Sequence, residues 1–83
     1  MDLNNGEGKI IDYKNQKVGA YKDNNGQTFA VQPNCTYEGC MVGWESNEKI
    51  YICPCCGSRY SFDGKVIKGP ATKELPKIKT TTL

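Results

Sequence analysis

Five cysteines are the residues of this chain best suited to chemistry, and its 83 residues include no histidine. Cys35 and Cys40 form a first group, and Cys53, Cys55 and Cys56 form a second, with twelve residues between the groups. Because folding can bring thiolates from two turns into one coordination sphere, this spacing predicts a metal site. The lack of histidine excludes Ser-His-Asp and Cys-His catalysis, mixed Cys/His zinc fingers and an imidazole switch near neutral pH.

Composition narrows the class of protein further. Eleven Lys and Arg against nine Asp and Glu give a formal charge of +2, which does not indicate a nucleic-acid partner. No apolar run approaches the roughly 20 residues of a membrane helix, and no signal peptide is visible, so we expect a cytoplasmic protein without a membrane partner. A chain this short has a small core, so a metal or disulfide is expected to stabilise it.

Short strands separated by turn residues must position the cysteines. Runs rich in β-branched and aromatic residues predict strands at 9–13, 17–22, 27–32, 49–53, 59–62 and 65–68. Between the second and third strands, Asn25-Gly26 predicts a type I′ hairpin turn. We expect one all-β domain over residues 1–83, with an edge strand near Ile78 and fraying within the tail 77–83.

The two cysteine loops carry a family resemblance. They read Cys35-Thr36-Tyr37-Glu38-Gly39-Cys40 and Cys53-Pro54-Cys55-Cys56-Gly57-Ser58-Arg59-Tyr60. This sequence resembles the Rieske iron–sulfur family, whose loops read C-T-H-x-G-C and C-P-C-H-G-S-x-Y or F. Trp44, the run 62–66 and the run 69–71 extend the similarity. The resemblance implies a small antiparallel sandwich or barrel with a two-loop subdomain, at about 33–44 and 53–62, that binds a [2Fe-2S] cluster.

The resemblance also implies roles for individual residues. Cys35 and Cys53 match the cysteine ligands of the buried iron, and Cys40 and Cys55 match the pair that forms a disulfide between the loops. Ser58 and Tyr60 match hydroxyl donors to a bridging sulfide and a ligand thiolate, which raise the reduction potential.

The chain departs from the family at both histidine ligands of the outer iron, where it has Tyr37 and Cys56. We therefore expect Cys35, Cys53, Cys56 and Tyr37 as the ligand set. Phenolate and thiolate are anionic, so they favour the oxidised cluster and predict a potential well below the Rieske range.

The resemblance implies an electron-transfer module of an oxidoreductase, with no catalytic constellation of its own. It is similar to Rieske domains at the carboxyl end of FAD-dependent oxidoreductases. The expected partner is therefore a flavin-containing domain or another redox protein, and the isolated chain is expected to be a monomer.

Two alternatives stay open at the level of the sequence. Zinc or another single ion could be held by thiolates in a structural role, either within a Rieske-like scaffold or in a zinc ribbon that uses Cys35, Cys40, Cys53 and Cys56. A metal-free domain would instead rely on a Cys40–Cys55 disulfide and serve protein contacts.

Overall fold

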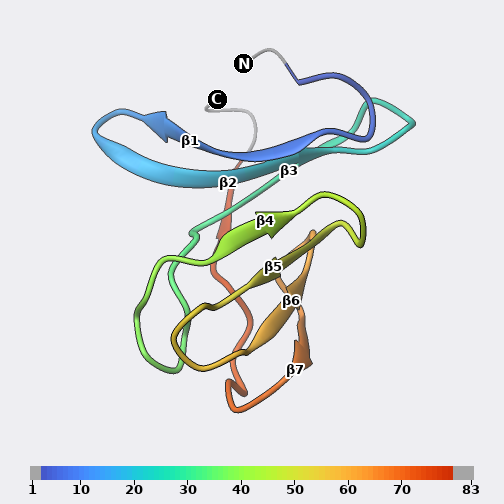
Figure 1. Cartoon of the computed structure of the whole chain (residues 1–83). Helices are drawn as coiled ribbons and strands as arrows, with labels where there is room; N and C mark the ends of the chain where they lie inside the picture. Colours follow the sequence, from blue (N-terminus) through green and yellow to red (C-terminus); the bar gives the residue numbers. More distant parts are fainter. Residues whose placement is uncertain (1–2, 80–83) are drawn as a thin grey trace.

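The computed structural model describes residues 3–79 and contains eight short strands in two four-stranded antiparallel sheets (Figure 1). The first sheet has the order β1-β2-β3-β8, with β1 Gly8–Tyr13, β2 Gln16–Lys22, β3 Thr28–Val31 and β8 Lys77–Ile78. The second has the order β4-β5-β6-β7, with β4 Gly43–Glu45, β5 Ile50–Ile52, β6 Arg59–Ser61 and β7 Val66–Lys68. The all-β prediction is confirmed, and residues 3–79 include no helix that could cross a membrane.

The hairpin turns differ from the prediction. Between β2 and β3, only Gly26 has a positive φ (84°), and the N–H of Gly26 donates to the Asp23 carbonyl at 3.0 Å. The predicted type I′ turn is therefore wrong there, since that turn needs positive φ at both central residues. Those torsions occur in the β1–β2 hairpin instead, at Lys14 (φ 49°) and Asn15 (φ 65°). The Asp23 carboxylate explains the difference, because it accepts from the N–H groups of Asn25 and Gln27 at 2.9 and 2.8 Å and holds a longer loop.

The tail returns along the second sheet to the first. Leu75 is fully buried in the core, and its N–H donates to the carbonyl of Gly64 at 2.8 Å. β8 then pairs with β3 through the register Ala30↔Ile78 and Val31↔Lys77. The predicted edge strand is thus present, whereas residues 80–83 of the tail expected to fray lie outside the described residues.

Aromatic side chains join the two sheets. Tyr21 of β2 lies 4.9 Å from Phe62 and 5.4 Å from Trp44 of β4, measured between ring centroids. Trp44 in turn lies 4.9 Å from Tyr51 of β5, which is completely buried. Aromatic pairs at such distances stabilise a core beyond their buried area. The cluster fixes the second sheet against the first and so positions the loops that extend from β5 and β6.

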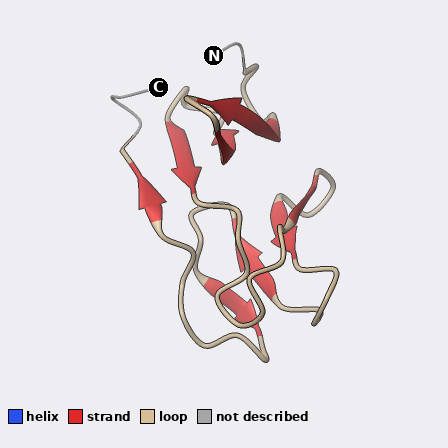
Figure 2. Ribbon diagram, turned by 90° about the vertical axis from the view of Figure 1, so that its left-hand side faces the viewer, coloured by secondary structure: helices blue, strands red, loops and turns tan. Residues whose placement is uncertain are grey.

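The loops gather at the end of the second sheet that lies away from the first sheet (Figures 1 and 2). One loop precedes β4 and contains the first cysteine group, and the other joins β5 to β6 and contains the second. Both loops thus emerge from neighbouring strands of one sheet, since β4 pairs with β5 and β5 with β6.

Gly64, in the turn between β6 and β7, gives a first prediction. Gly64 has φ +91°, and a Cβ there would lie 2.9 Å from the Leu75 carbonyl oxygen and 3.2 Å from Val31 Cγ1. We expect Gly64→Ala to lower the free energy of unfolding by about 2–4 kcal/mol, through torsional strain and overpacking. Urea unfolding of the metal-free protein measures it. In the control Gly43→Ala, where a Cβ meets nothing within 4 Å, the change should stay below about 0.5 kcal/mol; equal losses in both variants would contradict the explanation.

Candidate metal centre

The two cysteine loops close by the same hydrogen-bond pattern. In the first, Gly39 N donates to the Cys35 carbonyl and Cys35 N donates to the Cys40 carbonyl, both at 2.8 Å. In the second, Gly57 N donates to the Cys53 carbonyl at 2.9 Å and Cys53 N donates to the Ser58 carbonyl at 2.8 Å. Gly39 and Gly57 share a φ of 78°, which non-glycine residues rarely adopt. Two equivalent turns therefore present Cys35 and Cys53 as corresponding residues.

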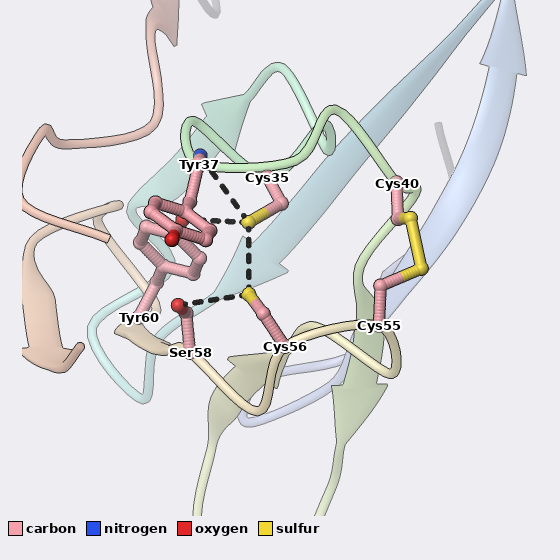
Figure 3. The surroundings of a disulfide bond; sticks show 7 residues. All are labelled: Cys35, Tyr37, Cys40, Cys55, Cys56, Ser58 and Tyr60. Atoms are coloured by element: carbon pink, nitrogen blue, oxygen red, sulfur yellow. Dashed lines mark hydrogen bonds between the residues drawn. A yellow bond between two sulfur atoms is a disulfide. The ribbon is translucent and has the colours of Figure 1, made fainter. Parts of the chain in front are cut away.

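A disulfide joins the tips of the loops. Cys40 and Cys55 are bonded with an S–S distance of 2.02 Å and a Cα–Cα distance of 6.4 Å (Figure 3). The predicted disulfide is confirmed. Because Cys40 is bonded to Cys55, the four-thiolate zinc-ribbon set, which needs Cys40 as a ligand, does not form in this structure.

The three remaining cysteines come together on the inner side of the disulfide. Their Sγ atoms all lie within 4.8 Å of one another, and Cys35 Sγ lies 3.6 Å from Cys56 Sγ. Cys35 and Cys53 are buried, with 3% and 0% of their surface exposed, whereas Cys56 is half-buried. The structure thus brings together three of the four predicted ligands, with the Cys56 side open toward solvent.

Cys35 lies in a site suited to a thiolate. Burial raises the pKa of its thiol, but hydrogen bonds from Tyr60 and from the backbone N–H groups of Glu38 and Tyr37 outweigh burial and lower the pKa to about 6. The Tyr60 hydroxyl donates to Cys35 Sγ at 3.3 Å and the Tyr37 N–H at 3.4 Å. For Cys53, burial dominates and raises the pKa above the usual value, although the N–H groups of Cys56 and Cys55 oppose it.

Ser58 connects the site to the chain beyond β7. It is fully buried, and its Oγ accepts a hydrogen bond from the Ala71 N–H at 3.0 Å. Its hydroxyl proton is then free to be donated to Cys56 Sγ, 3.1 Å away. The predicted donor thus faces Cys56, the residue at the position of a family histidine.

Tyr60 is held by the first loop in a similar way. Its hydroxyl accepts from the Thr36 N–H at 3.1 Å, while the Thr36 hydroxyl donates to the Lys73 carbonyl at 2.6 Å. Thr36, Lys73 and Ala71 were not assigned as site residues from the sequence. The resemblance over Thr36 and the run 69–71 was an available signal for Thr36 and Ala71, whereas no pattern in the sequence indicated Lys73.

Tyr37 differs from the other predicted ligands. Its backbone N–H contacts Cys35, but 59% of the residue is exposed. Tyr37 therefore lies largely at the surface, unlike the buried Cys35 and Cys53.

The Tyr60 hydroxyl gives a second prediction. Tyr60→Phe removes the donor to Cys35 and leaves the Thr36 N–H without its partner, so we expect a loss of about 1–3 kcal/mol in the free energy of unfolding. Denaturant unfolding of the metal-free protein measures the loss. Tyr13→Phe is the matched control, because the Tyr13 hydroxyl makes no hydrogen bond within residues 3–79. Unchanged stability in Tyr60→Phe would show that these hydrogen bonds contribute nothing.

The donor set fits a cluster with two iron ions. Two buried thiols suit an inner iron, and three hydroxyl and amide groups donate to the sulfurs, as expected around thiolate ligands. Cys56 and Tyr37, which are nearer to solvent than Cys35 and Cys53, would be the ligands of an outer iron. The fold and this site define a small all-β domain that holds metal through thiolates on two paired loops.

Comparison with known proteins identifies the family. The model of the Rieske [2Fe-2S] domain matches residues 1–79, and the chain belongs to this family. It is a Rieske-type electron-transfer domain, for which the family implies a [2Fe-2S] cluster. A putative Rieske 2Fe-2S iron–sulfur protein, YhfW of Bacillus subtilis, is 40% identical over 93% of the chain. The cytochrome b6-f complex iron–sulfur subunit of Chlorobaculum tepidum is 38% identical over 94% of it.

Among solved structures, the plasma membrane Rieske protein PetC3 from Synechocystis PCC 6803 is similar with a TM-score of 0.78 and 36% identity. The match covers 87% of this chain and 74% of that one. The curated relatives are longer proteins, since the chain spans only 15% of YhfW and 42% of the Chlorobaculum subunit.

These relatives correct the predicted partners. The expectation of a flavin-containing partner and no membrane is wrong, because several relatives are iron–sulfur subunits of cytochrome b6-f complexes. The physical reason for the error is that the composition of these 83 residues does not indicate which larger complex the domain belongs to. Net charge and the lack of an apolar run describe only the domain itself.

Proposed function

We propose that this Rieske domain carries one electron at a [2Fe-2S] cluster whose outer iron is ligated by Cys56 and Tyr37, at a potential below that of histidine-ligated members. When bound, the cluster supplies reversible one-electron chemistry. Cys35 and Cys53 would hold the inner iron. The observation that carries the proposal is that Cys56, which is half-buried, lies beside the buried thiols of Cys35 and Cys53 and is hydrogen-bonded to Ser58 at 3.1 Å.

The residues around the thiols would tune the site. Tyr60 and Ser58 donate to Cys35 and Cys56, which withdraws charge from the sulfurs and partly offsets the effect of the anionic ligands. The core around Cys53 and Tyr60 excludes water from the inner side, since both residues are 0% exposed. The exposed Tyr37 leaves the outer side accessible to an electron donor or acceptor.

The domain is proposed to work as a module of a larger electron-transferring oxidoreductase. Two observations support this: the curated relatives are much longer than the chain, and several are named as subunits of cytochrome b6-f complexes. The cytoplasmic location stays a prediction from the sequence.

Anaerobic reconstitution with iron and sulfide tests the cluster. The expected product contains about two irons and two sulfides per chain and has a reduction potential below about −150 mV, the lower end of the Rieske range. Cys56→Ser should lower the iron content or destabilise the cluster, whereas Ser46→Ala, an exposed residue outside both loops, should not. A wild-type potential above −150 mV, or a Cys56→Ser variant indistinguishable from wild type, would contradict the ligand assignment.

A further inference from the structure

We propose that Cys35, Cys53 and Cys56 also form a complete site for a single thiophilic ion, Zn²⁺, with a water molecule in the fourth position. This inference concerns the same thiols as the proposed function, but a different occupant. It also differs from a zinc ribbon, because it uses neither Cys40 nor Cys55, which form the disulfide.

The sulfur spacing carries the proposal. With Zn–S distances of about 2.3 Å, two thiolates on one tetrahedral ion lie about 3.8 Å apart. Cys35 Sγ and Cys56 Sγ are 3.6 Å apart, and all three sulfurs lie within 4.8 Å of one another. Ligands on opposite irons of a two-iron cluster point away from each other and must lie farther apart. The observed spacing is therefore the one that a single ion needs, whereas a two-iron cluster would need Cys56 Sγ to lie farther from Cys35 Sγ.

Hydrogen bonds to the sulfurs support the same conclusion. Three thiolates around Zn²⁺ carry a net negative charge, and burial makes such a charge costly unless donors surround it. The Tyr60 hydroxyl and the Tyr37 N–H donate to Cys35, and the Ser58 hydroxyl is placed to donate to Cys56. Donors of this kind orient ligand atoms and stabilise their charged form.

One side of the site is partly open to solvent. Cys35 and Cys53 form the buried wall, whereas Cys56 is half-buried and Tyr37 is mostly exposed. Three protein ligands with a fourth exchangeable position is a coordination that Zn²⁺ adopts in proteins. The zinc site depends on Cys56, because a histidine at that position would leave only two thiols to bind the ion.

Titration of the metal-free full chain with Zn²⁺, in competition with a chromophoric chelator, tests the inference. The disulfide is kept intact, and Cd²⁺ serves as a second probe, because the intensity of its thiolate charge-transfer band reports the number of sulfur ligands. We expect one ion per chain and the intensity of three thiolates. In Cys56→Ser the affinity should fall by at least about 100-fold, since even lost outer partners of a ligand can cost that much, and the band should fall to two thiolates.

Ser46→Ala is the control. Ser46 is exposed and lies outside both cysteine loops, so the Zn²⁺ affinity of this variant should stay within about twofold of wild type. A wild-type band of two thiolates, an unchanged Cys56→Ser affinity, or an equal loss in Ser46→Ala would overturn the inference. Cluster assembly is scored separately by iron and sulfide content. A chain that assembles the cluster but binds no Zn²⁺ overturns only this inference, and one that binds Zn²⁺ but assembles no cluster overturns only the proposed function.

Discussion

Replacing Tyr37 and Cys56 together with histidine should raise the reduction potential of the reconstituted domain by at least about 250 mV. This is the difference between about −400 mV for clusters with four thiolates and −150 mV at the lower end of the histidine-ligated range. Neutral imidazoles remove the anionic charge of the two outer ligands, which makes reduction of the cluster less costly. Imidazole is smaller than the phenol of exposed Tyr37, whereas at half-buried Cys56, which packs against the core, it is larger than the thiol and must extend toward solvent.

Potentiometric titration of the wild type, both single variants and the double variant measures the effect. Cys56→His alone should produce most of the shift if thiolate ligation at the outer iron lowers the potential, and Tyr37→His alone should produce less, given the exposure of Tyr37. A double variant whose potential equals that of wild type would show that neither residue ligates the outer iron.

Removing the disulfide should lower the stability of the domain strongly. Cys40→Ser with Cys55→Ser opens a loop whose ends are 15 residues apart, and loop-closure entropy predicts a loss of about 3 kcal/mol in the free energy of unfolding. Marginal stability amounts to roughly 0.05–0.15 kcal/mol per residue, so this is a large share of the total for so short a chain. Cys40 is half-buried and Cys55 exposed, so the serines themselves should add little cost.

Urea unfolding of the metal-free double variant measures this loss. Wild type under a reductant that opens the disulfide is the matched comparison, and the two samples should agree. A loss well below 1 kcal/mol in both would mean that the hydrogen bonds within each loop, together with the core around Cys35 and Cys53, already hold the loops in place.

Much of the fold follows from local patterns in the sequence. The predicted strands at residues 9–13, 17–22, 49–53 and 59–62 are present to within one or two residues, because alternation and turn residues act locally. The first hairpin loops were harder to assign. Asn25-Gly26 is a strong signal for a type I′ turn, but the Asp23 carboxylate accepts hydrogen bonds from two N–H groups there and stabilises a different loop. Lys14-Asn15, whose sequence is a weaker signal, has the positive φ values of a type I′ turn.

The metal site, like the fold, could be predicted only in part from the sequence. Two loops with cysteine at the first position and glycine four residues later could be recognised from the sequence, as could the Cys40–Cys55 pair, through resemblance to a family. Cys56 was also expected beside Cys35 and Cys53, but its distance from each of them could not be predicted. That Cys56 Sγ lies 3.6 Å from Cys35 Sγ depends on how the β5–β6 loop lies against the loop before β4.

By itself, the sequence determined the β class, the two cysteine loops and the absence of imidazole, because each depends on residue types or on neighbours along the chain. Only the tertiary structure decided which sulfurs lie close together and that Tyr37 stays exposed. It also decided two hydrogen-bonded chains, one from Ala71 through Ser58 to Cys56 and one from Thr36 through Tyr60 to Cys35. These contacts join residues up to 37 positions apart, as in the hydrogen bond from Thr36 to Lys73. Their geometry is set by the packing of the second sheet and its tail, which local patterns do not encode.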